Sequence, residues 1–163
     1  MKKIFILLLA ITITSCAQKT TFNEAALNET FTNLDGKQIA FQEILKKYKG
    51  KTIFIDIWAS WCSDCVAGLP DLKKLQSKEK DVVYVMLSLD KTAETWKLGI
   101  EKHNLKAEHY FITKGWKPSE FCKSIDLDWI PRYLIVGKDG TIKMFKAIKF
   151  SDKKITKTIK EDK

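Results

Sequence analysis

The residues best suited to chemistry in this chain are two cysteines three positions apart, Cys62 and Cys65, in the stretch WASWCSDC at 58–65. A pair with this spacing can be half of a zinc site, a structural disulfide, or a redox centre that cycles between dithiol and disulfide. The other two cysteines of the chain are Cys16 and Cys122. The choice among these chemistries depends on where the protein works and on which elements hold the pair.

The first fifteen residues have the pattern of an export signal. Two lysines precede an apolar run over 4–13, which is too short to span a bilayer as a helix. The run ends in ITSC, which resembles the bacterial lipobox, where cleavage makes the cysteine the lipid-bearing first residue. We expect 1–15 to be a signal peptide, Cys16 to carry lipid in a bacterial membrane, and 16–30 to be a polar tether. An ordinary signal peptide with a coincidental cysteine is the alternative.

Export bears directly on the chemistry of the cysteine pair. Thiols outside the cytosol are not held reduced by default, which favours a pair that cycles or is oxidised. With Cys16 taken as a lipid anchor, Cys62, Cys65 and Cys122 are too few for a four-cysteine zinc site. No metal site and no cofactor are therefore predicted.

The composition is that of an ordinary globular domain. The 163 residues include 45% hydrophobic and 30% charged residues, enough for one hydrophobic core. The formal charge of +9 becomes +7 once Lys2 and Lys3 leave with the signal. The remaining lysines are scattered and form no basic stripe interleaved with aromatics, so no nucleic-acid partner is predicted.

The residues before and after the pair predict a strand that leads into a helix. The β-branched and aromatic run at 52–58 is typical of a strand buried on both faces. The segment at 66–78 has the apolar spacing of an amphipathic helix, in which Pro70 is expected to produce a kink. The cysteines thus lie where the strand ends and the helix begins.

The rest of the chain predicts an α/β domain over 31–150 with a mixed central sheet and helices on both faces. An N-terminal hairpin is expected at 31–41 around Asp35-Gly36, because these residues favour a tight turn. The tail at 151–163 is charged, and either a terminal helix or a frayed end fits it. The other expected elements are a helix at 42–50, strands at 81–90 and 109–112, helices at 92–103 and 118–125, and strands at 132–136 and 141–146.

These motifs together resemble the thioredoxin-fold thiol-disulfide oxidoreductases. The resemblance rests on Asp56-x-Trp58-Ala59-x-Trp61-Cys62-x-x-Cys65, on Pro70 five residues later, and on Trp129-Ile130-Pro131 before the last hairpin. It extends from about Phe31 to Lys146, and more narrowly the chain is similar to the membrane-tethered, extracytoplasmic branch that includes the cytochrome-maturation reductases. The resemblance therefore implies a thioredoxin-like fold.

The position of the cysteines predicts their roles. Cys62 lies at a helix N-terminus, where free N–H groups and the helix dipole stabilise a thiolate, so we expect it to be the nucleophile. Cys65 is expected to be more buried and to resolve the mixed disulfide by attacking Cys62. A static structural disulfide is the alternative. Ser63 and Asp64 depart from the prolines common in this turn, and Asp64 puts negative charge beside the thiol.

The resemblance also implies roles for residues around the cysteines. Asp56 matches the acid that lies beneath the second cysteine and shuttles its proton, the alternative being a surface carboxylate. Ile130 and Pro131 match a cis-peptide segment opposite the cysteines that pairs with substrate. Trp61 is expected to contribute to docking, with core filling as the alternative for both tryptophans. Arg132 departs from the small residue usual after this proline, which leaves substrate preference open.

The leading hypothesis is an exported enzyme that exchanges dithiol for disulfide with protein substrates and is recharged by an upstream thiol donor. Reductase is the favoured direction, with isomerase and oxidase open. A copper-binding module on the same fold is the main rival, although no histidine or methionine neighbours the pair in sequence. A peroxidase is disfavoured, because its single-cysteine turn is not found. Cys122 is predicted to be a small core residue, with a third redox thiol as the alternative.

Overall fold

The computed structural model describes residues 19–163. The expected signal peptide over 1–15 and the expected lipid site at Cys16 lie outside the described residues. Within the described part, no helix is both long enough and apolar enough to cross a bilayer.

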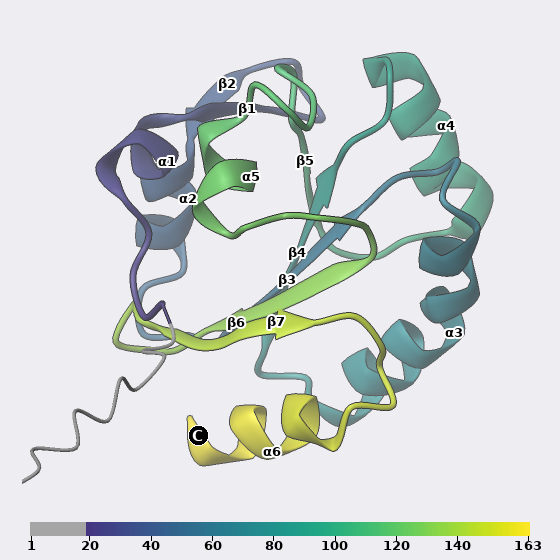
Figure 1. Ribbon diagram of the computed structural model, residues 1–163. Coiled ribbons are helices and arrows are strands. Elements are labelled where there is room, and N and C mark those ends of the chain that lie inside the picture. Colours follow the sequence, from purple (N-terminus) through teal and green to yellow (C-terminus); the bar gives the residue numbers. More distant parts are fainter. Residues whose placement is uncertain (1–18) are drawn as a thin grey trace, which may run out of the picture.

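A seven-stranded mixed sheet forms the centre of the molecule, in the order β2-β1-β5-β4-β3-β6-β7 (Figure 1). β3, β4 and β5 run parallel to one another, and the other neighbouring pairs are antiparallel. The strands are β1 (Thr30–Asn33), β2 (Gln38–Ala40), β3 (Ile53–Trp58), β4 (Val83–Ser88), β5 (Glu108–Phe111), β6 (Arg132–Val136) and β7 (Ile142–Ala147). This sheet confirms the predicted fold class, the N-terminal hairpin and the central strand before the cysteines.

Helices cover both faces of the sheet (Figure 1). Their bounds are α1 (Glu24–Asn28), α2 (Phe41–Lys47), α3 (Ser63–Lys78), α4 (Ala93–His103), α5 (Glu120–Ser124) and α6 (Lys153–Glu161). One layer contains α1, α2 and α5, and the other contains α3, α4 and α6. β3 is buried at every position because it lies between the two layers at the centre of the sheet.

The helix that carries the cysteines is held by one apolar face. Leu69, Leu72 and Leu75 of α3 are buried against the sheet, as their spacing predicts. The helix is continuous through Pro70, which lies at an exposed position. The start of α3 is therefore fixed in space by the packing of the turns that follow it.

The second half of the segment expected to be a tether, 16–30, belongs to the fold. The carbonyl of Thr20 accepts a hydrogen bond of 2.7 Å from the N–H of Ile142. Phe22 is buried, and its ring lies 4.8 Å from that of Phe41 and 6.0 Å from that of Phe121. A buried aromatic cluster of this kind stabilises the fold, so the domain begins well before residue 31.

The C-terminal tail is not a frayed end but the helix α6. Ile155 and Ile159 are four residues apart, so they share one face of the helix, and both are buried. Asp162 closes the end by accepting hydrogen bonds from the Thr52 hydroxyl at 2.7 Å and from the Lys138 N–H at 3.0 Å. The tail at 151–163 thus takes the terminal-helix alternative, and the folded part of the chain continues past residue 150 because two apolar residues dock the helix.

Candidate active site

The two cysteines lie at the junction between β3 and α3 and form a disulfide bond, with their Cα atoms 5.2 Å apart. Cys62 is the N-cap of α3, and its sulfur accepts a hydrogen bond of 3.1 Å from the backbone N–H of Cys65. The residues are 6% and 4% exposed, so their burial differs less than expected. The position at the helix start is the one predicted, and there the N–H groups favour a negatively charged sulfur.

The peptide bond between Ile130 and Pro131 is cis, as the resemblance implies. The carbonyl oxygen of Ile130 lies 3.7 Å from the sulfur of Cys62. The side chain of Ile130 is fully buried, whereas Pro131 is only partly buried. The structure therefore brings together Cys62, Cys65 and the proline segment, which are far apart in the chain.

Asp56 is a buried carboxylate, so the surface alternative for it is wrong. It is 4% exposed, and its Oδ1 atom has no hydrogen-bond partner. It lies in register between Met86 of β4 and Tyr133 of β6. Removal from water raises the pKa of Asp56 to about 8, because burial penalises the charged form.

Asp56 faces the layer of helices that contains the cysteines. Tyr133 stands opposite Asp56 across an antiparallel pair, so the two side chains are on the same face of the sheet. The Tyr133 hydroxyl lies 3.1 Å from the point where a Cβ atom on Gly68 of α3 would sit. The acid therefore lies beneath the helix that begins with the Cys-x-x-Cys turn.

The two tryptophans before the cysteines have different environments. Trp58 is fully buried, which supports core filling, whereas Trp61 is 50% exposed. Trp129, to which we assigned no role from sequence, is 61% exposed beside the cis peptide bond. Its ring lies 5.7 Å from that of Trp116. Trp61 precedes the cysteine turn and Trp129 precedes the cis peptide bond, so each presents an exposed apolar ring that can contact another protein.

A buried carboxylate that sequence reasoning missed holds the loop before Cys62. Asp90 is 3% exposed and accepts hydrogen bonds from the Ser60 N–H at 3.1 Å and the Ser60 hydroxyl at 2.6 Å. The Ser88 hydroxyl donates a further bond of 2.8 Å to it. Because β3 and β4 are parallel neighbours, their carboxyl ends lie at the same edge of the sheet, so the loops that follow them meet. That topology was the signal that could have indicated Asp90.

A groove of about 690 Å³ reaches the turn of the pair at Asp64, and neither cysteine is among its lining residues. One wall is the start of α3 with Asp64 and Gly68, and the other walls are the proline segment and the connection between β7 and α6. Its apolar lining includes Trp129, Pro131 and Phe150. An extended peptide that reaches Cys62 can lie in such a groove.

Arg132 does not line the groove, so its predicted bearing on substrate choice is not direct. Its side chain is fully buried and bonds to the loop before the proline segment.

Cys122 is 2% exposed in α5, and burial raises the pKa of its thiol to about 11. These observations agree with Cys122 as a core residue. Among residues 19–163, no group of three or more histidine, cysteine or acidic residues is placed to hold a metal ion.

Comparison with known proteins places this geometry in context. Residues 50–142 match a family model described as thioredoxin-like. The chain is 31% identical over 127 residues to the thiol-disulfide oxidoreductase ResA of Bacillus thuringiensis subsp. konkukian, covering 77% of this chain and 69% of that protein. A solution structure from Bacteroides vulgatus, assigned as a thiol-disulfide oxidoreductase, has a TM-score of 0.69 at 30% identity over 85% of this chain and 88% of the other.

A second solved structure supports the fold alone. It is a thiol:disulfide interchange protein from Bacteroides sp., with a TM-score of 0.68 at 23% identity over 88% of this chain and 89% of the other.

Proposed function

Because the chain belongs to the thioredoxin-like family of thiol-disulfide oxidoreductases, we propose that it reduces disulfides of protein substrates outside the cytoplasm. The observation that carries this proposal is the position of Cys62. It caps α3, lies 3.7 Å from the Ile130 carbonyl of the proline segment, and is bonded to Cys65. A static structural disulfide has no need of a neighbouring groove or of exposed tryptophans.

The proposed reaction transfers two electrons from the protein dithiol to the substrate disulfide. The Cys62 thiolate attacks one substrate sulfur, an S–S bond forms between protein and substrate, and the other substrate sulfur leaves as a thiolate. The Cys65 thiolate then attacks the Cys62 sulfur, which releases the second substrate thiolate and closes the Cys62–Cys65 disulfide. An upstream dithiol reduces that disulfide and returns the protein to its starting state.

We assign the proton transfer of this second step to Asp56. A group with a pKa of about 8 exchanges a proton readily near neutral pH, where the Cys65 thiol must lose its own. Asp56 lies beneath α3 and has one oxygen without a partner. In the forward direction its ionised fraction takes the proton of Cys65, and in the return direction it gives a proton back.

Substrate binding is assigned to the surface around the first sulfur. In this assignment the backbone of Ile130 and Pro131 pairs with an extended segment of the substrate, and Trp61 contacts the neighbouring part of the substrate. The groove of about 690 Å³ and the exposure of Trp61 support this assignment. Such pairing gives affinity through main-chain bonds and is tolerant of substrate sequence.

The proposed location is the outside of a bacterial membrane, with the domain tethered through lipid on Cys16. The support is the export pattern of 1–15 and the lipobox-like ITSC at 13–16. The domain starts close to residue 20, so the tether consists of only a few residues after Cys16. A short tether keeps the reactive groove near the membrane surface.

The reducing direction is supported by the charges near the pair. Asp64 lies in the first turn of α3, where its negative charge opposes a thiolate on Cys62. Strong oxidants have a very stable thiolate, so a less stable one favours a reducing couple. We expect a midpoint nearer the roughly −270 mV of thioredoxin than the roughly −120 mV of a strong oxidase.

Two experiments test the proposed function. Equilibration of the pair against a dithiothreitol or glutathione series measures the potential, and a midpoint above about −180 mV would contradict the reductase assignment. Replacing Cys65 with serine blocks the resolving step, so the variant is expected to retain substrates as mixed disulfides in the native envelope. Cys65→Ala is a second trap and should also retain substrates as mixed disulfides. Cys62→Ser is the matched control and should retain none, because it lacks the attacking sulfur.

A further inference from the structure

The chain contains one arginine, and it lies directly behind the proline segment. Lysine and arginine number 29 together, and Arg132 is the single arginine among them. Every lysine in residues 19–163 is exposed, whereas the Arg132 side chain is fully buried. A buried cation needs specific acceptors, so the contacts of this side chain indicate its purpose.

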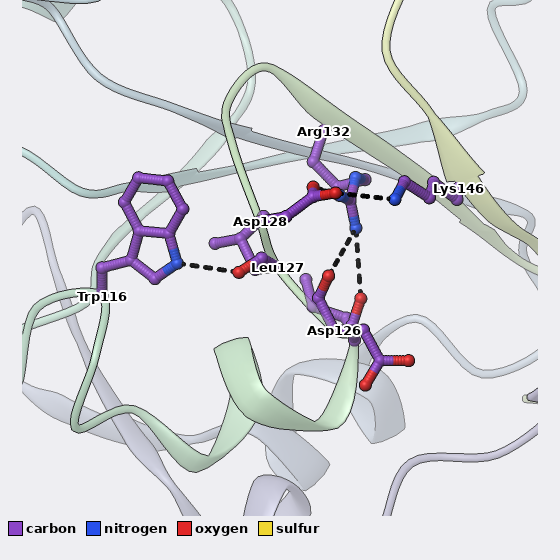
Figure 2. A network of polar contacts seen from close by, with 7 residues as sticks. Trp116, Asp126, Leu127, Asp128, Arg132 and Lys146 are labelled. Atoms are coloured by element: carbon purple, nitrogen blue, oxygen red, sulfur yellow. Dashed lines mark hydrogen bonds and ion pairs between the residues drawn. The ribbon is translucent and has the colours of Figure 1, made fainter.

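The guanidinium group of Arg132 binds the loop that connects α5 with β6 (Figure 2). One terminal nitrogen donates to the carbonyl of Ile125 at 3.1 Å and to that of Asp126 at 3.5 Å. The other donates to the Asp128 carboxylate. A single side chain thus spans three residues of one short segment.

Two further side chains in Figure 2 bind this loop, and Lys19 pairs with the Asp126 carboxylate at 2.7 Å. The Trp116 indole N–H donates to the carbonyl of Leu127 at 3.0 Å, and Lys146 of β7 lies 2.9 Å from the second oxygen of Asp128. Residues 125, 126 and 127 therefore each offer a carbonyl to one of these side chains, and Asp128 offers both of its carboxylate oxygens. Backbone N–H groups of Asp126 and Leu127 tie the start of the loop to α5, and the side-chain bonds fix the part that leads to the proline segment.

The geometry requires arginine rather than another lysine. A guanidinium group carries five donors in a rigid planar fork, so it can bind several acceptors in different directions at once. The ammonium group of lysine places its donors on one atom and cannot reach across three residues in the same way. The use of the only arginine at this position agrees with that need.

We infer that Arg132 is a positioning residue for substrate binding, which holds segment 125–131 so that the Ile130 carbonyl faces Cys62. Arg132 follows the cis peptide bond immediately, and Ile130 lies 3.7 Å from the reactive sulfur. Loosening the loop displaces the edge on which an extended substrate pairs and leaves the thiol itself in place. This inference rests on the proposed function, because it assumes pairing of substrate with the segment.

The test compares a protein disulfide with a small one. We would measure KM and kcat for dithiothreitol-coupled reduction of insulin and of oxidised glutathione by Arg132→Met and Arg132→Lys. For Arg132→Met the insulin KM is expected to rise between about tenfold and about 100-fold, the scale of a displacement near 1 Å. The values for glutathione and the rate of Cys62 alkylation should change by less than about twofold. Arg132→Lys should fall between, because it keeps the charge and loses the fork.

Two control variants separate positioning from loss of stability. Ile44→Ala removes a buried side chain of α2 outside this network, so it destabilises the fold while the loop contacts remain. Lys143→Met removes an exposed ion pair between Lys143 of β7 and Asp139 of the turn before it. Neither control should raise the insulin KM selectively. If Arg132→Met does not fold, Arg132→Lys and Asp128→Asn provide the test instead. Asp128→Asn should raise the insulin KM by only about threefold, because Arg132 keeps its bonds to the carbonyls of Ile125 and Asp126.

The outcomes distinguish this inference from the proposed function. If the unaltered protein does not reduce insulin, the proposed function fails. If it does, and the Arg132 variants keep the insulin KM or lose activity equally toward insulin and glutathione, then the positioning role alone is overturned. The same loss in Ile44→Ala would also overturn it, because general destabilisation would then explain the effect.

Discussion

Replacing Asp56 with asparagine is expected to stabilise the protein by an amount that grows as the pH rises. Asp56 ionises near its ordinary pKa of 3.8 in the unfolded chain and near 8 in the folded one, because burial opposes its charge. Between these two values the folded state binds a proton that the unfolded state has lost. Stability contributed by the protonated form is therefore complete at low pH and is lost progressively as the pH increases. Asparagine does not ionise and escapes this loss.

The expected size follows from the pKa shift. Each unit of difference corresponds to about 1.36 kcal/mol, and pH 7 lies about 3 units above 3.8, so the penalty there is about 4 kcal/mol. The buried amide of asparagine has no partner ready for it and costs about 1–3 kcal/mol. The variant should thus be more stable by about 1–3 kcal/mol at pH 7. Near pH 4.5 the variant should be as stable as the unaltered protein or less stable.

Urea unfolding of the oxidised protein at several pH values measures the effect. The difference in free energy of unfolding between Asp56→Asn and the unaltered protein should increase by about 4 kcal/mol from pH 4.5 to pH 7.5. This increase does not depend on the constant cost of the amide. Asp81→Asn, at an exposed position, is the matched control and should show almost no pH-dependent difference. A difference for Asp56→Asn that stays flat with pH would refute the reasoning, because it would mean that Asp56 is ionised in the folded state.

The remaining predictions concern the cysteines. In the reduced protein, iodoacetamide should modify Cys62 much faster than Cys65 or Cys122, as mass spectrometry of a time course would show; earlier labelling of either of the others contradicts the choice of nucleophile. Cys62→Ser should abolish turnover of a model disulfide, whereas Cys122→Ser should keep most of it, since that thiol is buried with its pKa raised to about 11; a large loss would make Cys122 a redox residue. Replacing Cys16 should release an active protein from membranes, and retention after a carbonate wash would count against the lipid anchor.

Local patterns in the sequence predicted the site wherever neighbouring residues determine the structure. The apolar run at 52–58 and the helix after it have distinct periods, so the position of Cys62 at a helix start followed from the chain alone. The hairpin around Gly36 was equally local, because its positive φ of 84° suits glycine. The burial of Asp56 was predictable for the same reason, since every neighbour in that strand is apolar.

Tertiary structure decided the contacts between residues that the chain does not place together. The bonds from Ser60 to Asp90 and from Arg132 to the loop at 125–128 depend on which strand ends meet and on where a loop returns. A polar side chain has the same appearance in a sequence whether it lies in water or is buried with its partners. The docking of Phe22 and of α6 was missed for a related reason. A few apolar residues give a weak periodic signal by themselves, and only the surface that receives them makes their burial favourable.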